Sequence, residues 1–90
     1  MIVKWTKTAL NNLASIADYI AEDNHERAVT FVQELRMKTH ALGEFPNMGK
    51  AGRVFGTHEL VLHKNYTAIY RVKDDSVQIL RIHHSAMKMQ

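Results

Sequence analysis

HELVLHKNYTAIYRVKDDSVQILRIHH, residues 58–84, is the stretch that decides the fold of this chain. It contains three strand patterns, which span residues 58–64, 66–73 and 76–83. Lys64-Asn65 and Asp74-Asp75 separate these patterns, and Asn and Asp favour tight turns because their side chains hydrogen-bond the neighbouring backbone. Short turns between strands predict antiparallel hairpins. We therefore expect three consecutive antiparallel strands.

Side-chain alternation assigns the strand residues to two faces of the sheet. One face is nearly all apolar and should pack against the rest of the chain; it holds Leu60, Leu62, Ala68, Tyr70, Val72, Leu80, Ile82 and His84. The other face mixes aliphatic and cationic side chains; it holds Glu59, Val61, His63, Ile69, Arg71, Val77, Ile79, Arg81 and His83. No element of the chain is left to cover this second face. It is therefore either a docking surface for another chain or an ordinary half-solvated sheet face.

The first half of the chain predicts two helices. From residue 8 to residue 21 apolar side chains recur every three or four positions, and Thr6 can cap this helix. After an interruption at Asp23, the same spacing runs through residues 28–42, with Asn24 as the N-cap and Gly43 at the end. A short break between two amphipathic helices predicts an antiparallel helical hairpin.

The remaining segments complete the expected architecture. Residues 1–5 favour β structure and predict a further strand at the edge of the sheet. Residues 44–56 hold Pro46 and three glycines, so we expect a loop there, with a short strand at residues 53–55. The predicted fold class is α+β: one domain over residues 1–90, with the order β-α-α-β-β-β. Its N-terminal helical hairpin packs on a small, largely antiparallel sheet.

The composition is that of a soluble globular protein and excludes several other classes. The hydrophobic fraction of 46% and the charged fraction of 23% exclude a disordered tail, a coiled-coil rod and a collagen-like chain. The chain has neither an apolar run of the roughly 18–20 residues that cross a bilayer nor a secretory signal, so we expect a cytoplasmic protein and no membrane partner. It has no cysteine, and His83 and His84 should point to opposite faces of one strand. We therefore expect no metal site, and without a phosphate-binding glycine loop we expect no cofactor.

The charge is unevenly distributed along the chain. Residues 46–90 hold seven Lys or Arg against three Asp or Glu, whereas residues 1–45 hold five against six. A basic half is typical of chains with an anionic partner, nucleic acid or an acidic protein segment, and equally of a plain solvated face. Lys50, Arg53 and Lys64 are the candidates for a nucleic-acid or target contact.

Several segments, in this order and at this spacing, resemble toxins of the RelE/ParE superfamily, the stable partners in type II toxin–antitoxin modules. They are Val3-Lys4-Trp5-Thr6, Phe45-Pro46-Asn47-Met48-Gly49, Gly52-Arg53-Val54-Phe55-Gly56-Thr57-His58-Glu59-Leu60, Tyr70-Arg71-Val72 and Ile79-Leu80-Arg81-Ile82-His83-His84. The resemblance covers nearly the whole chain and implies the same helical hairpin and sheet. It also implies a cognate antitoxin as partner, with operator DNA bound only through the antitoxin complex.

The resemblance implies one of two mechanisms. One branch cleaves mRNA in the ribosomal A site, and the ParE-like branch, found in plasmid stabilisation modules, is linked to poisoning of DNA gyrase. RelE-like members place an arginine just after the aromatic residue that begins the middle strand, where this chain has Thr67. They place a second arginine beyond the last strand, where this chain has Met87. They also have a tyrosine in the C-terminal tail, whereas residues 86–90 contain no tyrosine. We therefore favour a gyrase inhibitor that is not an enzyme.

Two alternatives remain open. The first is a ribosome-dependent mRNA endonuclease, because His84-Ser85 resembles the ending of YafQ-like members. Its catalytic candidates are His84 and His83 for proton transfer and Arg53 and Arg81 for holding phosphate. Each histidine also has a purely structural interpretation. His84 would then be a hydrogen-bonded side chain on the helix side, and His83 a solvated side chain on the surface. The second alternative is an inactive chain that binds the antitoxin and acts with it as a co-repressor.

The antitoxin is expected on the mixed sheet face and in the groove beside the helical hairpin. Its candidate contacts on that face are Val61, His63, Ile69, Arg71, Ile79 and Arg81. A segment that lies there should be extended or helical, disordered when free, and acidic or amphipathic.

Overall fold

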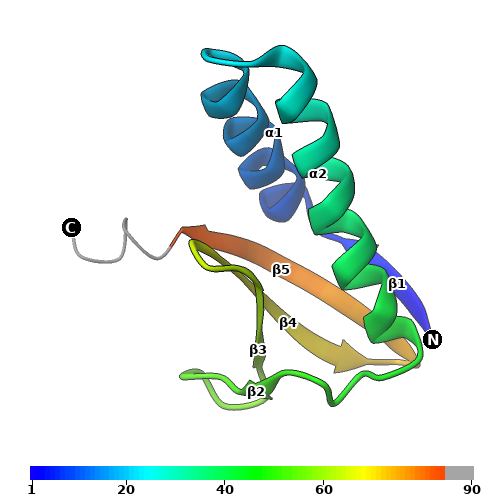
Figure 1. Ribbon diagram of the computed structural model, residues 1–90. Coiled ribbons are helices and arrows are strands. Elements are labelled where there is room, and N and C mark those ends of the chain that lie inside the picture. Colours follow the sequence, from blue (N-terminus) through cyan, green and yellow to red (C-terminus); the bar gives the residue numbers. More distant parts are fainter. Residues whose placement is uncertain (85–90) are drawn as a thin grey trace.

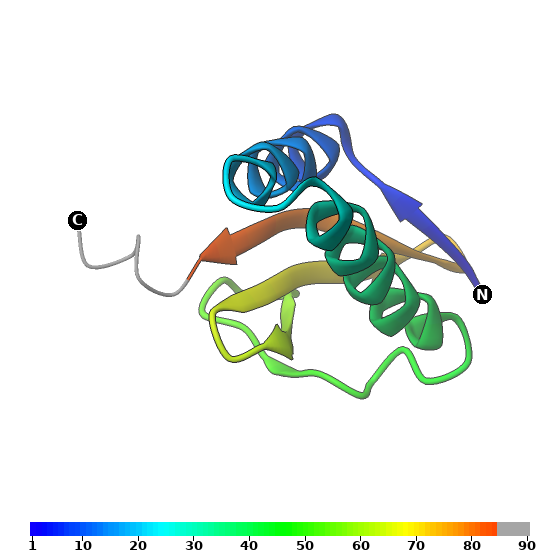
Figure 2. The same cartoon turned by 45° about the horizontal axis from the view of Figure 1, so that its top comes forward.

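The computed structural model describes residues 1–84 as two helices packed on one face of a five-stranded sheet (Figures 1 and 2). The elements are β1 (Ile2–Trp5), α1 (Lys7–Ala21), α2 (His25–His40), a 3-10 turn (Ala41–Gly43), β2 (Lys50–Ala51), β3 (His58–His63), β4 (Tyr66–Lys73) and β5 (Ser76–His84). The predicted α+β class and the helical hairpin are confirmed.

The strand order in the sheet is β1-β5-β4-β3-β2. β1 lies parallel to β5 at one edge, and the other three pairs are antiparallel, as expected. The short strand predicted at residues 53–55 is wrong, because β2 lies at Lys50–Ala51 and the backbone then turns. In that turn the Thr57 N–H donates to the Val54 carbonyl at 3.0 Å.

Both predicted N-caps are confirmed. The Thr6 hydroxyl oxygen accepts from the Ala9 N–H at 3.2 Å, and the Asn24 side-chain oxygen accepts from the Arg27 N–H at 3.0 Å. Each bond satisfies one of the N–H groups that a helix leaves unpaired at its start. Thr6 also contacts the sheet, because its hydroxyl donates to the carbonyls of Ile79 and Leu80, each at 3.0 Å. The same side chain therefore starts α1 and attaches it to β5.

The core lies between the helical hairpin and the sheet. The fully buried side chains of its centre are Leu35, Leu42, Leu62, Tyr70, Val77 and Ile79. Tyr70 is the largest of them, and its hydroxyl donates to the Pro46 carbonyl at 2.8 Å and accepts from the Gly49 N–H at 2.9 Å. A side chain at Gly49 would collide with the Tyr70 ring, since an added Cβ would lie 2.8 Å from the Tyr70 hydroxyl. Tyr70 thus holds the 44–57 loop against the sheet.

A register shift in the β4–β5 pair changes the predicted faces of β5. Ile69 lies opposite Arg81, but Tyr70 lies opposite Ile79, so Leu80 is an extra residue on β5. A bulge of this kind reverses the alternation on one side of it. The assignment of Val77 and Ile79 to the open face was therefore wrong, because both are completely buried under the helices.

A second shift, in the β3–β4 pair, lies between Val61 and His63. His63 was predicted on the open face, but its ring lies 5.1 Å from the Phe31 ring in an edge-on contact, on the helix side. The Lys38 ammonium donates to the Leu62 carbonyl at 2.5 Å, so α2 supplies a partner for the backbone at this bulge. His63 and Ile79 are thus both displaced from the predicted docking face, by two separate bulges.

Replacing Tyr70→Phe should lower the free energy of unfolding by about 1–3 kcal/mol, because the Gly49 N–H and the Pro46 carbonyl then lose a buried partner. Urea denaturation measures this change. Tyr19→Phe is the matched control, since Tyr19 is 69% exposed and should change stability by less than about 0.5 kcal/mol. Equal stabilities of the two variants would show that the Tyr70 hydroxyl does not hold the loop.

Candidate functional site

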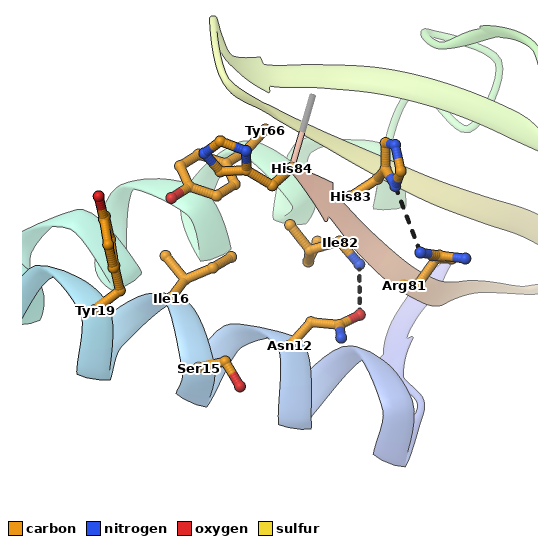
Figure 3. Close-up of a pocket in the computed structure, with 9 residues that line it drawn as sticks. All are labelled: Asn12, Ser15, Ile16, Tyr19, Tyr66, Arg81, Ile82, His83 and His84. Carbon is orange, nitrogen blue, oxygen red and sulfur yellow. Dashed lines mark hydrogen bonds between the residues drawn. The ribbon is translucent and has the colours of Figure 1, made fainter. Parts of the chain in front are cut away.

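A groove runs between α1 and the second half of β5 (Figure 3). β1 pairs with β5 only as far as Ile79, and beyond that point α1 lies along the strand edge. There the Asn12 side-chain oxygen accepts from the Ile82 N–H at 3.0 Å. The groove has a volume of about 710 Å³. Its lining residues are Asn12, Ser15, Ile16, Tyr19, Tyr66, Arg81, Ile82, His83 and His84.

The groove has an apolar floor and a polar rim. Ile16 and Ile82 face each other from α1 and β5, and the Tyr66 ring meets the His84 ring edge-on at 4.7 Å (Figure 3). Burial raises the pKa of Tyr66 above its ordinary value, and the nearby Tyr19 adds to that shift. Arg81 supplies a positive charge at the β5 wall. Such a surface suits an amphipathic segment with acidic groups.

Three of the four ribonuclease candidates, His84, His83 and Arg81, line the groove, whereas Arg53 does not. His84 lies on the helix side against Tyr66, whereas His83 and Arg81 lie on the open face, with Arg81 Nη2 3.4 Å from His83 Nδ1. The opposite orientation of the two histidines agrees with the sequence expectation. Arg53 belongs to the turn before β3, and β4 separates β3 from β5 by two strand spacings, about 10 Å. The structure brings Arg81 and His83 into contact with each other.

The three target-contact candidates also separate. Lys50 and Arg53 are both exposed and belong to one hairpin, formed by β2, the following turn and β3. Lys64 follows the opposite end of β3, and six extended residues span about 20 Å. Lys64 therefore lies in the turn between β3 and β4 and not beside Lys50 and Arg53.

Four of the six antitoxin-contact candidates lie on the open face of the sheet: Val61, Ile69, Arg71 and Arg81. His63 and Ile79 do not, for the reasons given above. The Arg71 Nε donates to the Gln78 side chain at 2.8 Å, and the Glu59 carboxylate accepts from the Arg53 N–H at 3.4 Å.

Sequence reasoning missed the α1 wall of the groove. Asn12, Ser15, Ile16 and Tyr19 follow the i, i+3, i+4, i+7 spacing that marks one face of a helix. That spacing was the available signal, but a half-polar face does not reveal that a strand edge lies opposite. Two comparisons made from the sequence concern residues outside the described range 1–84. They are the position of Met87, where RelE-like members have an arginine, and the C-terminal tail at 85–90.

Within residues 1–84, no three His, Asp or Glu side chains are grouped so that they could hold a metal ion. None of the helices in this range is long and apolar enough to cross a membrane.

Alkaline pH should destabilise the fold through its buried tyrosines. Burial raises the pKa of both Tyr66 and Tyr70, so folding favours their neutral forms. This contribution is complete below the unfolded pKa of about 10 and is lost as pH rises through the folded values. Urea unfolding at about pH 8 and pH 11 should show a fall in stability that is clearly smaller in Tyr66→Phe and only slightly smaller in Tyr19→Phe, because Tyr19 is the lesser cause of the Tyr66 shift. An equal fall in all three proteins would contradict this origin.

The chain is similar to known proteins along nearly its whole length. The family model described as ParE toxin of type II toxin-antitoxin system, parDE, matches residues 3–89. The inferred toxin Y4kP of Sinorhizobium fredii is 37% identical over 84 residues, covering 92% of this chain and 86% of that protein. Toxin RelE2 of Caulobacter vibrioides is 34% identical over 84 residues, covering 93% and 94% respectively.

Two solved structures share the fold. A chain of the chromosomal ParDE TA system from P. aeruginosa has a TM-score of 0.85 and 33% identity, covering 93% of this chain and 95% of that one. A chain of the RelBE2 toxin-antitoxin complex from Mycobacterium tuberculosis has a TM-score of 0.59 and 27% identity, covering 92% and 95%. A family match over nearly the full length and relatives above 30% identity agree with each other. The chain therefore belongs to the ParE toxin family of type II toxin–antitoxin systems, within the RelE/ParE superfamily.

Proposed function

We propose that this toxin arrests growth by inhibiting DNA gyrase in the cytoplasm, without being an enzyme, and that a cognate antitoxin neutralises it. The observation that carries the choice of mechanism is the incomplete set of ribonuclease candidates at the groove, because Arg53 lies away from it and the two histidines point to opposite faces of β5. Cleavage of RNA needs a base, an acid and phosphate-binding cations around one phosphate, within hydrogen-bond reach of the reacting atoms. Here His84 packs on Tyr66 on the helix side, and Arg53 lies two strands from Arg81. Thr67 stands beside His83 where RelE-like members have an arginine.

The groove between α1 and β5 supports the antitoxin part of the proposal. An amphipathic antitoxin segment would place apolar side chains between Ile16 and Ile82 and acidic groups at Arg81. From there it would continue onto the open face at Ile69 and Val61. The chain would act on operator DNA only through this antitoxin complex.

A ribosome-dependent mRNA endonuclease is the second candidate. The contact between Arg81 and His83, at 3.4 Å beside the groove, favours it, because it joins a cation to an imidazole, the side chain most often used for proton transfer. The similarity to a chain of the RelBE2 toxin-antitoxin complex also favours the endonuclease candidate. A chain that only binds the antitoxin, as an inactive co-repressor, is the third candidate.

Pulse-labelling after induction of this chain alone separates the three candidates. DNA synthesis should fall first while protein synthesis continues, because gyrase inhibition blocks replication before it affects translation. Co-expression of the antitoxin is the control and should restore both. An early collapse of translation would instead establish the ribosomal mechanism. Unaffected growth at high protein levels, with tight antitoxin binding, would establish the co-repressor.

Replacing Arg81→Glu should weaken antitoxin binding by about 3 kcal/mol or more, because the partner's acidic groups would be buried against a like charge. Calorimetry with the purified antitoxin measures the change. Lys7→Glu reverses an exposed charge at the start of α1, outside the groove, and should leave the affinity unaltered. Unchanged binding by the Arg81 variant would remove this residue from the interface.

A further inference from the structure

The turn at residues 52–57 is a rigid projection at the β2 edge of the sheet. The Gly52 N–H donates to the Thr57 carbonyl at 2.8 Å, and the Thr57 N–H and hydroxyl donate to the Val54 carbonyl at 3.0 and 2.6 Å. Gly56 has a φ of 85°, which is the value that the third residue of a type II turn requires. Phe55 is the second residue of that turn. Its backbone is therefore held in one conformation before any partner binds.

The base of this projection is also held in place. Tyr70 hydrogen-bonds the loop at Pro46 and Gly49, and β2 pairs with β3 through Lys50 and Ala51. An added Cβ at Gly52 would lie 2.3 Å from the Thr57 hydroxyl oxygen, so the two sides of the turn are in close contact. A preorganised loop of this kind loses little conformational entropy when it binds.

The turn exposes apolar side chains that the fold does not use. Phe55 is fully exposed at 102%, and the neighbouring Val54 is 68% exposed. Type II turns favour proline at the position of Phe55 and have no need of an aromatic side chain there. An aromatic group presented to water on a rigid turn contributes nothing to folding, whereas such groups are the usual anchors of protein interfaces.

The two charged side chains within residues 50–57 are both positive, and the Glu59 carboxylate lies at the base of the turn, where it accepts from the Arg53 N–H at 3.4 Å. Lys50 and Arg53 are exposed on the same hairpin, and residues 50–57 contain no Asp or Glu. We propose that this turn docks the toxin on its protein target, with Phe55 and Val54 entering an apolar pocket that has an acidic rim. The inference rests on the proposed function and names the part of the chain that contacts gyrase.

A protein is a better occupant than a nucleic acid. Single-stranded nucleic acids bind several aromatic rings in succession, each stacked on a base. The tip has one ring, and the aliphatic Val54 beside it offers no face for stacking. An aromatic and an aliphatic side chain together fill an apolar pocket on a folded surface.

The turn lies far from the antitoxin groove. β2 is at one edge of the sheet, while the groove follows β5, three strands away. Figures 1 and 2 both show the β2 segment at the side of the molecule opposite α1. The antitoxin contact proposed at Val61 is nearer, but Val61 lies within β3 and not in the turn. Substitutions at Phe55 should therefore separate target binding from antitoxin binding.

The test uses the purified full-length chain, purified DNA gyrase and the antitoxin. Phe55→Ala should weaken both gyrase binding and inhibition of supercoiling by about tenfold or more, as expected for an interface anchor. The double variant Lys50→Glu/Arg53→Glu should have a similar effect, and Phe55→Trp should retain binding. Met37→Ala removes a 74% exposed apolar side chain from α2 and is the matched control, with unchanged gyrase affinity. All variants should bind the antitoxin as the original chain does, which verifies their fold.

Three outcomes would overturn the inference. Phe55→Ala that inhibits gyrase as well as the original chain would exclude the turn and leave the proposed function standing. An original chain that neither binds nor inhibits gyrase would refute the proposed target and this docking site together. Growth arrest that depends on Phe55 but begins with loss of translation would show that the turn acts on the translation machinery and not on gyrase.

Discussion

The hydroxyl of Thr6 is the contact on which the arrangement of the functional surface depends. It caps α1 through the Ala9 N–H and at the same time binds the carbonyls of Ile79 and Leu80. The chain therefore leaves the sheet at Thr6, and β1 cannot continue along β5. The second half of β5 is left with a helix beside its edge in place of a strand. Because a helix is wider than a strand, a groove opens between the two.

This geometry separates two exposed surfaces of the molecule by their shape and position. The groove is apolar at Ile16 and Ile82 and cationic at Arg81, and the helices leave the opposite sheet face uncovered. The β2 edge instead carries a rigid turn with Phe55 at its tip. A small toxin has two binding requirements, its target and its antitoxin, and this fold provides two surfaces of different shape, a groove and a projecting turn, at different edges of one sheet.

The predicted fold depended on local signals and was largely confirmed. Both helix caps, the turn at Asp74-Asp75 and the edge position of β1 follow from side chains that act on their own backbone. The predicted docking face was only partly confirmed, since Val61, Ile69, Arg71 and Arg81 lie there but His63 and Ile79 do not. Strict alternation assumes a regular strand, and the two bulges break that assumption. A bulge depends on the neighbouring strand and on the helix above it, as the contact from Lys38 to Leu62 illustrates.

The sequence by itself determined the order of elements, their caps and turns, and the excess of cations in the second half of the chain. These properties depend on residues close together in the chain, so local physical chemistry is sufficient to read them. Only the tertiary structure decided that His63 and Ile79 lie on the helix side, that Arg53 lies two strands away from Arg81, and that Asn12 on α1 faces Ile82. Each of these depends on contacts between distant segments. Their geometry is set by strand register and helix packing, which no single segment specifies.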